Sequence, residues 1–343
     1  MRTSFFIILF GIFTFALVAF KQQLTSTSID FIIPKKWPKP VYTFENNPLT
    51  EEGFQLGRKL FYDPILSRDS TISCASCHLQ YTGFTHVDHT VSHGIYGRKG
   101  TRNSPALINL AWNKSFHWDG GVNHIEVQGI NPIQHVAEMD NTLEEVIRSL
   151  QRSTSYPAQF EKVFGKKEIT TSDIMKALTQ YTASLVSSNS KYDQVMRKDK
   201  GVAFTSQEKN GLKLFQQHCT ACHTEPLFTN TFFASNGLKM DSLLKDTGRY
   251  GITYQGKDSM QFKIPTLRNI EFTFPYMHDG RYKKLKDVIN YYSDGIDPGN
   301  RYLHNSLQKP LNFTEIQKKD ILSFLLTLTD KTFLYNIRFS FPR

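Results

Sequence analysis

The sequence contains no run of alternating apolar and polar residues of the kind that predicts β-strands, and no nucleic-acid-binding motif. Cysteine is scarce, with four residues in a chain of 343. The lack of alternating runs argues against a sheet-based fold, and the lack of a binding motif argues against a nucleic-acid partner. The chain is nevertheless not intrinsically disordered, because 39% hydrophobic and 13% aromatic residues suffice for a packed core.

The first 22 residues predict an export signal or a membrane anchor. Arg2 precedes an apolar run from Phe5 to Phe20. At about 16 residues this run is long for the core of a signal peptide and short for a transmembrane helix. It has no A-x-A cleavage site, and no cysteine follows it for lipidation, so both alternatives stay open. Either one places the rest of the chain in the periplasm or cell envelope, with residues 23–47 as a linker.

Basic residues outnumber acidic ones, which gives a formal net charge of +10 and a pI of about 9.3. Lys and Arg are spread along the whole chain, as is typical of a solvated surface. A basic face that steers an acidic partner protein is the alternative.

All four cysteines lie in two Cys-x-x-Cys-His motifs, CASCH at 74–78 and CTACH at 219–223. Disulfides or redox-active pairs do not explain the histidine that follows each pair, and one zinc site would require two distant motifs to meet. Cys-x-x-Cys-His is instead the attachment pattern of haem c, in which two thiols bind the vinyl groups and the histidine binds the iron. The sequence therefore predicts two covalently bound haems c, one held by Cys74, Cys77 and His78 and the other by Cys219, Cys222 and His223.

A weak internal repeat indicates two haem domains. EEGFQLGRKLF (51–61) precedes the first motif and SQEKNGLKLF (206–215) precedes the second, and both carry G-x-K-L-F on a predicted amphipathic helix. We expect an all-α fold of two cytochrome c-like haem domains with long ordered loops. The polar segment 188–207 predicts the boundary between a catalytic domain, 48–200, and an electron-transfer domain, 201–343.

Four further helices are predicted from their apolar periodicity. Two of them begin with capping-box patterns, Thr142-x-x-Glu145 and Thr314-x-x-Gln317. The predicted helices are 142–152, 171–187, 283–293 and 313–329.

The segment 116–140 is the best candidate for a catalytic pocket, because it offers Trp118, Gln128 and Glu138 among prolines and glycines. A haem with an open sixth position catalyses reactions when acid–base groups lie beside it. A buried Glu138 or Gln128 could move a proton from the inner to the outer oxygen of peroxide. The alternative is an ordinary loop with a solvated glutamate.

Several longer motifs carry a resemblance to a known family: LFYDPILSRDSTISCASCH, GTRNSPALIN, FHWDGG, SNSKYDQ, GLKLFQQHCTACH, IPTLRN and PYMHDGR. On these motifs the chain resembles the bacterial di-haem cytochrome c peroxidases, which include the MauG-type enzymes. The resemblance extends from Pro48 to Asp330.

The resemblance implies roles for individual residues. His78 matches the proximal ligand of the catalytic haem, and His223 matches that of the electron-transfer haem. Glu138 occupies the place of the distal catalytic glutamate, with Gln128 beside it. Trp118 matches the tryptophan that helps electrons to cross between the haems.

The resemblance also implies a calcium ion between the domains, held by Asn103 and by the backbone carbonyls of Thr273 and Pro275. His278 matches a histidine that lies near a haem propionate and is not a ligand. One departure is that WDGG replaces the family's WDGR, so Gly121 stands where an arginine is usual and its charge contact is in doubt.

His93 resembles the loop histidine that caps the catalytic haem in peroxidases that need reductive activation. The loop from His93 to Asn103 is about two residues longer than in those enzymes, and His86 and His89 are competitors. The alternative is a surface histidine beside an open iron.

Tyr292 stands where most of these peroxidases carry the methionine ligand of the second haem, fourteen residues beyond His278, and MauG-type enzymes carry a tyrosine there. Met240, Met260 and Met277 are the thioether alternatives. A phenolate ligand stabilises higher oxidation states of iron, whereas a methionine ligand raises the haem potential.

We therefore expect an exported di-haem peroxidase that reduces hydrogen peroxide with electrons from a small cytochrome or cupredoxin. MauG-like oxidation of a protein side chain or another organic substrate is the main alternative, and a di-haem electron carrier without catalysis is the third. A homodimer stays open.

Overall fold

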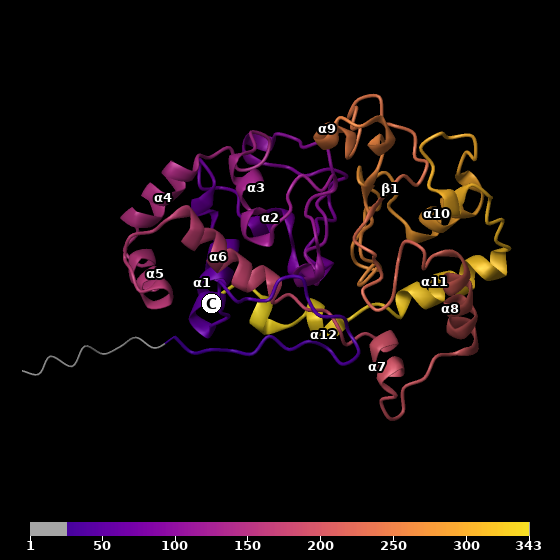
Figure 1. Ribbon diagram of the computed structural model, residues 1–343, viewed down its shortest axis with the longest axis horizontal. Helices are drawn as coiled ribbons and strands as arrows, with labels where there is room; N and C mark the ends of the chain where they lie inside the picture. The colour runs from indigo at the N-terminus through magenta and orange to yellow at the C-terminus, as the bar shows by residue number, and fades with distance from the viewer. Residues whose placement is uncertain (1–25, 343) are drawn as a thin grey trace, which may run out of the picture.

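The computed structural model describes residues 26–342, and its regular structure is mainly helical (Figure 1). The apolar segment 1–22 lies outside the described residues. Within residues 26–342, no helix is long and apolar enough to cross a membrane. The helices are α1 (Glu51–Tyr62), α2 (Cys74–Cys77), α3 (Ile130–Gln134), α4 (Leu143–Arg152), α5 (Tyr156–Phe164), α6 (Thr171–Ala183), α7 (Lys191–Arg197), α8 (Ser206–His218), α9 (Tyr250–Thr253), α10 (Leu285–Asn290), α11 (Glu315–Leu326) and α12 (Lys331–Leu334).

The structure confirms the helices predicted from the apolar pattern, with differences at their ends. The Thr142 hydroxyl accepts a hydrogen bond from Glu145 N at 3.2 Å at the start of α4, and α11 begins with the full capping box of Thr314 and Gln317. The helix predicted over 283–293 is α10 followed by a π-helical turn, η7 (Tyr291–Gly295). Two antiparallel strands, β1 (Phe233–Ala234) and β2 (Phe262–Lys263), are too short for any alternation to have predicted them.

The glycine of each G-x-K-L-F repeat allows two helices to pack at very close range. A Cβ atom on Gly57 of α1 would lie 1.9 Å from the Ala177 carbonyl oxygen of α6. A Cβ atom on Gly211 of α8 would lie 1.9 Å from the Asp320 carbonyl oxygen of α11. The repeat therefore specifies two equivalent helix pairs, α1 with α6 and α8 with α11, and each pair contributes buried residues to its own hydrophobic cluster.

The C-terminal segment returns to the first of these clusters. Phe333 and Phe339 are buried among the residues of α1 and α6, and the Tyr181 hydroxyl donates to the Phe339 carbonyl at 2.7 Å. Figure 1 shows this yellow segment, with α12, beneath the indigo and magenta helices of the N-terminal half. The last residues of the chain therefore fasten the C-terminal half to the N-terminal half.

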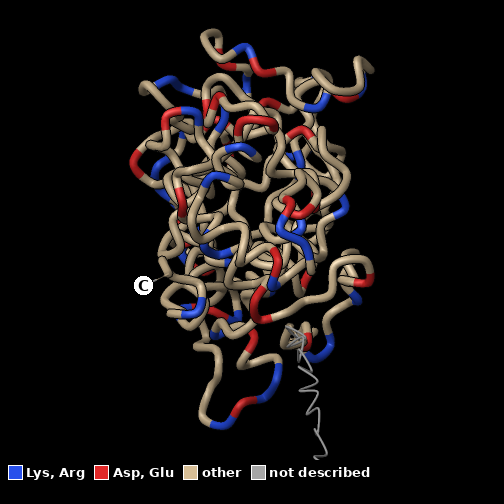
Figure 2. Tube along the Cα trace, turned by 90° about the vertical axis from the view of Figure 1, so that its left-hand side faces the viewer, with Lys and Arg blue, Asp and Glu red and all other residues tan. Residues whose placement is uncertain are grey.

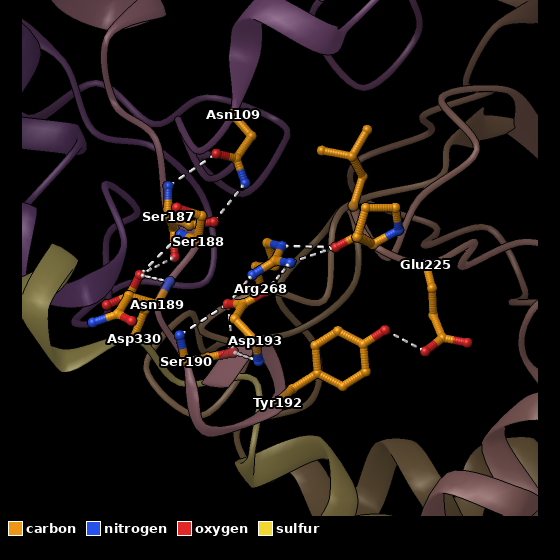
Figure 3. A network of polar contacts seen from close by, with 12 residues as sticks. Asn109, Ser187, Ser188, Asn189, Ser190, Tyr192, Asp193, Glu225, Arg268 and Asp330 are labelled. Carbon is orange, nitrogen blue, oxygen red and sulfur yellow. Dashed lines mark hydrogen bonds and ion pairs between the residues drawn. The ribbon is translucent and has the colours of Figure 1, made fainter. Parts of the chain in front are cut away.

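A polar network surrounds the segment between α6 and α7, where the two halves meet (Figure 3). Asp330 accepts hydrogen bonds from the backbone N–H groups of Ser188 and Asn189 at 3.0 and 2.8 Å. The fully buried Arg268 makes a two-pronged ion pair with Asp193, at 2.9 and 2.8 Å. Planar, two-pronged pairs of this kind fix orientation as well as energy, so this network sets how the two halves join.

Residues 26–47, expected as a linker, pack against the body. The Trp37 ring lies edge-on to Trp112 at 5.1 Å, and the Arg268 guanidinium lies 4.5 Å from the centre of the Trp37 ring. In the view of Figure 2, charged residues of both signs are interspersed along the chain.

Candidate haem sites

The first Cys-x-x-Cys-His motif forms α2, a single helical turn that follows Ser73, so that Cys74 and Cys77 lie one turn apart. His78 directly follows the helix, and its Nδ1 donates to the Phe84 carbonyl at 2.8 Å. This bond leaves Nε2 free to bind a metal. Burial lowers the pKa of His78 to about 4, so the imidazole is neutral and able to act as a ligand.

The second motif repeats this geometry after α8. The Nδ1 atom of His223 donates to the Phe228 carbonyl at 3.1 Å, and burial lowers the pKa of His223 to about 4. Phe84 and Phe228 are both fully buried and both have a positive φ, 58° and 55°. The two histidines are therefore held in the same way by corresponding loops.

Both sites fit a covalently attached haem. The four cysteines are free of disulfides, and in residues 26–342 no group of three or more His, Cys, Asp or Glu side chains is placed to hold a metal ion. The disulfide and zinc interpretations therefore do not fit this structure.

A cavity of about 260 Å³ lies at the second motif and reaches the junction of the two halves. His223, Cys219 and Cys222 line it, and so do Trp118 and Asn103. Its wall is mainly apolar, as a haem requires. The apolar side chains of this wall include Phe215, Leu227, Ile264, Leu285, Ile289 and Phe313.

Tyr292 also lines this cavity, from the π-helical turn η7. Its Oη accepts a hydrogen bond from Asn236 Nδ2 at 3.3 Å. Burial raises the pKa of Tyr292 to about 12, although the Asn236 bond lowers it, so the phenol keeps its proton unless a cation lies beside it. The structure brings Tyr292 and His223 to one cavity.

Of the three alternative methionines, Met277 lines the same cavity, and its Sδ accepts from Asn236 Nδ2 at 3.4 Å. Met240 and Met260 are not among the described residues that line it, and Met240 is 49% exposed. Met277 is therefore the one thioether of the three that competes with Tyr292 for this site.

Glu138 lies beside the first motif, where its charge acts on Cys74 and Cys77. Burial raises the pKa of Glu138 above its usual range, and the nearby His135 offsets this only in part. Among the described residues the carboxylate has no hydrogen-bond or ion-pair partner. A half-buried carboxyl group without a protein partner is available to a ligand, which argues against the solvated loop.

Gln128 and Trp118 belong to the same segment as Glu138, residues 116–140. The side-chain amide of Gln128 has no hydrogen-bond partner within residues 26–342. The backbone carbonyl oxygen of Gln128 lies 3.3 Å from His117 Nε2. Trp118 Nε1 donates to the Asn103 carbonyl at 2.8 Å, and the Trp118 carbonyl accepts from Lys263 N at 2.7 Å. Trp118 is thereby held by one residue from each half of the chain.

The ring of His93 lies in a row of three histidines. Its centroid is 3.9 Å from that of His89, which is 4.9 Å from that of His86. The His93 backbone contacts the first motif, because its carbonyl oxygen accepts a hydrogen bond from Cys77 Sγ at 3.4 Å. The imidazole of His93 lies against that of His89, with the two rings tilted by 42°.

The three residues expected to hold calcium, Asn103, Thr273 and Pro275, are all among those that line the same cavity. Asn103 Nδ2 donates to the Thr90 carbonyl at 3.1 Å, which leaves its Oδ1 free for a cation. His278 is buried, stacks on Phe262 at 3.7 Å between ring centroids, and lines the cavity.

Gly121 stands where the resemblance would place an arginine, yet Asp119 has a cationic partner. Arg102 contacts Asp119 and makes a two-pronged pair with Asp246 at 2.6 and 2.8 Å.

Sequence reasoning missed three polar residues that line the cavity: His117, Asn236 and Lys263. His117 lies close enough for its charge to lower the pKa of His78, after the larger effect of burial. Burial lowers the pKa of Lys263 to about 8. The signal for His117 was present in FHWDGG, directly before Trp118, whereas Asn236 and Lys263 carried no motif.

Comparison with known proteins gives a consistent result. Residues 51–201 match the family described as di-haem cytochrome c peroxidase. The chain is 33% identical over 317 residues to the methylamine utilization protein MauG of Methylorubrum extorquens, covering 90% of this chain and 86% of that protein. It is 34% identical over 264 residues to cytochrome c551 peroxidase of Pseudomonas aeruginosa, covering 74% and 75% of the two chains.

Among solved structures, a MauG-like protein associated with microbial copper homeostasis is 30% identical to this chain. The two superpose with a TM-score of 0.85 over 92% of this chain and 99% of the other.

Proposed function

Since this chain belongs to the di-haem cytochrome c peroxidase family, we propose that it reduces hydrogen peroxide to water with electrons from a small redox protein. Membership confirms two covalently bound haems c and an oxidoreductase of the cytochrome c peroxidase type. The observation that carries the proposed reaction is the half-buried carboxyl group of Glu138, which lies beside the first motif without a protein partner among the described residues. An electron carrier would have no use for such a group, so this third hypothesis is the weakest.

We assign His78 and His223 as the axial ligands on one side of the two irons, because both are neutral and present Nε2. When bound, each haem would supply an iron that can bind a ligand and exchange one electron. Glu138 would take a proton from one oxygen of the peroxide and return it to the other, so that this second oxygen leaves as water. Two electrons and two further protons complete the conversion of one peroxide to two waters.

Gln128 and Trp118 support this chemistry from the same segment. The free amide of Gln128 can hydrogen-bond the peroxide and orient it toward Glu138. Trp118, fixed between Asn103 and Lys263, places an aromatic ring on the way between the two halves. We propose that electrons cross there, beside a calcium ion held by Asn103, Thr273 and Pro275.

We propose that the iron at His78 stays open in the resting protein, because the His93 ring lies against that of His89, with ring centroids 3.9 Å apart. We further assign Tyr292 as the sixth ligand of the haem at His223, since its phenol lines that cavity from a turn that follows α10. His278 then hydrogen-bonds near a haem propionate.

Tyr292 is the specific observation that favours the second candidate function, MauG-like oxidation of a protein side chain or another organic substrate. An oxygen ligand lowers the potential of a haem and favours storage of an oxidising equivalent over acceptance of electrons from a small cytochrome. The similarity to MauG over 90% of this chain points the same way.

We assign residues 48–200 to the catalytic haem domain and residues 201–343 to the electron-transfer domain, with the final residues returning to the first. The equivalent helix pairs and histidine loops support this division. We place the protein in the periplasm or cell envelope, because covalent haem attachment and the apolar N-terminus both accord with export.

Steady-state turnover of peroxide by the holoprotein, with a reduced cytochrome c or cupredoxin as donor, tests the proposed function. We expect peroxide-dependent oxidation of the donor. No turnover, together with a stable state two equivalents above the resting protein after peroxide is added, would contradict the peroxidase and support the MauG-like alternative.

A further inference from the structure

Asn236 contacts every candidate for the sixth ligand that lines the second haem cavity. Its Nδ2 donates to Tyr292 Oη at 3.3 Å and to Met277 Sδ at 3.4 Å. The phenol oxygen and the thioether sulfur therefore lie within two hydrogen-bond lengths of each other. Tyr292 and Met277 are fifteen positions apart in the sequence, and Asn236 brings them to one amide group.

The orientation of the Asn236 amide is fixed by the chain around it. Leu238 N donates to Asn236 Oδ1 at 3.3 Å, which turns the NH₂ end toward Tyr292 and Met277. Gly237 follows with φ of 82°, and its carbonyl accepts from Asn300 Nδ2 at 3.2 Å. The amide is therefore held by a tight turn and not by a mobile side chain.

Tyr291 fastens the same residue from the other side. Its hydroxyl donates to the Asn236 carbonyl at 3.0 Å, and its ring lies edge-on to Tyr292 with centroids 5.7 Å apart. Both tyrosines belong to the π-helical turn η7, and such turns are frequent at functional sites. Tyr291 thus bonds the backbone carbonyl of Asn236, and Tyr292, the next residue, bonds its side-chain amide.

We propose that Asn236 is a positioning residue that presents Tyr292 to the second haem and holds Met277 back as a competing ligand. This inference rests on the proposed role of Tyr292. Oxygen ligands suit ferric iron, whereas thioethers suit the softer ferrous state and raise the haem potential. By fixing which of the two groups faces the iron, Asn236 decides whether the second haem stores oxidising equivalents or accepts electrons from a donor protein.

Replacement of Asn236 by leucine, Asn236→Leu, in the holoprotein tests this role. Wild-type protein should show the resonance Raman bands of an iron-bound tyrosinate. The variant should lose most of their intensity, and the potential of the second haem should rise as Met277 competes. The spectrum of the first haem should stay unchanged, which a general loss of structure would not allow.

Two matched variants separate positioning from packing. Met277→Leu alone should keep the tyrosinate bands. Asn236→Leu combined with Met277→Leu should recover those bands and abolish the rise in potential, because the competitor is gone. Asn236→Ser, which keeps an acceptor for Leu238 N, replaces the leucine variant if that variant fails to retain haem, and the same loss is expected.

Tyrosinate bands in the wild type that persist in the Asn236 variants, with an unchanged potential, would overturn the positioning role alone. Absence of these bands from the wild type would overturn the assignment of Tyr292 and, with it, this inference.

Discussion

The two candidate haem sites hold their histidines alike and differ in the other polar side chains near the motif. In both, a histidine donates from Nδ1 to the carbonyl of a buried phenylalanine, at 2.8 Å in the first site and 3.1 Å in the second. The first site has the half-buried Glu138, which has no partner among the described residues, whereas the second has Tyr292 bonded to Asn236. We propose that the shared histidine loops hold the haems and that the side chains that differ set what each haem does.

The largest expected effect comes from removing the charge of the first site. Glu138→Gln should lower peroxide turnover by about 10²–10⁴-fold, the range for loss of a positioned proton-transfer group. Stopped-flow and steady-state rates with a reduced donor measure it. The spectrum of the second haem should not change.

Glu144→Gln, at an exposed position of α4, is the matched control and should retain wild-type turnover. A Glu138→Gln protein that turns over at the wild-type rate would show that the two sites do not differ in the way proposed.

The ion pair at the junction tests whether the two halves unfold together. Asp193→Asn leaves Arg268 buried without its partner, which should cost about 3–5 kcal/mol and lower the melting temperature of both halves together. Asp199→Asn, in a surface pair, should cost about 0–1 kcal/mol and serves as the control. Separate melting of the two haem signals, with only one shifted, would contradict the coupling.

The same pair predicts a pH dependence. Burial raises the pKa of Asp193, but the bonds from Arg268 outweigh it, so the pKa lies below its usual range. The charged carboxylate thus stabilises the fold above pH of about 4, the pKa of an unfolded Asp, and this contribution is lost as the pH falls through the folded-state pKa. The difference in melting temperature between wild type and Asp193→Asn should shrink below that pH. A melting-temperature difference that grows below that pH would contradict the stabilising role of the Asp193 carboxylate.

The smallest expected effect is a loss of stability when the glycine of either repeat is replaced by alanine. Gly57→Ala and Gly211→Ala each force a methyl group onto a carbonyl oxygen of the facing helix, and each should destabilise the protein by about 1–3 kcal/mol. Gly256→Ala, where a Cβ would meet nothing within 4 Å, is the control. Thermal unfolding followed by circular dichroism measures all three. Tolerance of alanine at only one of the two repeat glycines would show that the helix pairs are not equivalent.

The haem-attachment motifs and most helices could be predicted from the sequence because their signals are local. Cys74, Cys77 and His78 fall within one helical turn, and the cap of α4 needs only Thr142 and the backbone three residues on. The G-x-K-L-F repeat could be recognised in the sequence. The reason for its glycine, the close approach of the facing helix at Gly57, could be found only in the structure.

The remaining features of the sites depend on contacts between distant segments. Asn236 bonds a tyrosine 56 residues away, and no spacing rule predicts this contact. The contact between the His93 and His89 rings depends on loop conformation, so the sequence left the role of His93 open. The π-helical turn at Tyr291 was also hidden, because its apolar pattern is that of an ordinary helix end.

Electron paramagnetic resonance of the oxidised holoprotein, recorded with and without cyanide, tests the difference between the two sites most directly. We expect cyanide to change the signal of the haem at His78 and to leave that of the haem at His223 unchanged, because Tyr292 closes the second iron. A first-haem signal that ignores cyanide, or a second-haem signal that shifts with it, would contradict the proposed division into an open and a closed site.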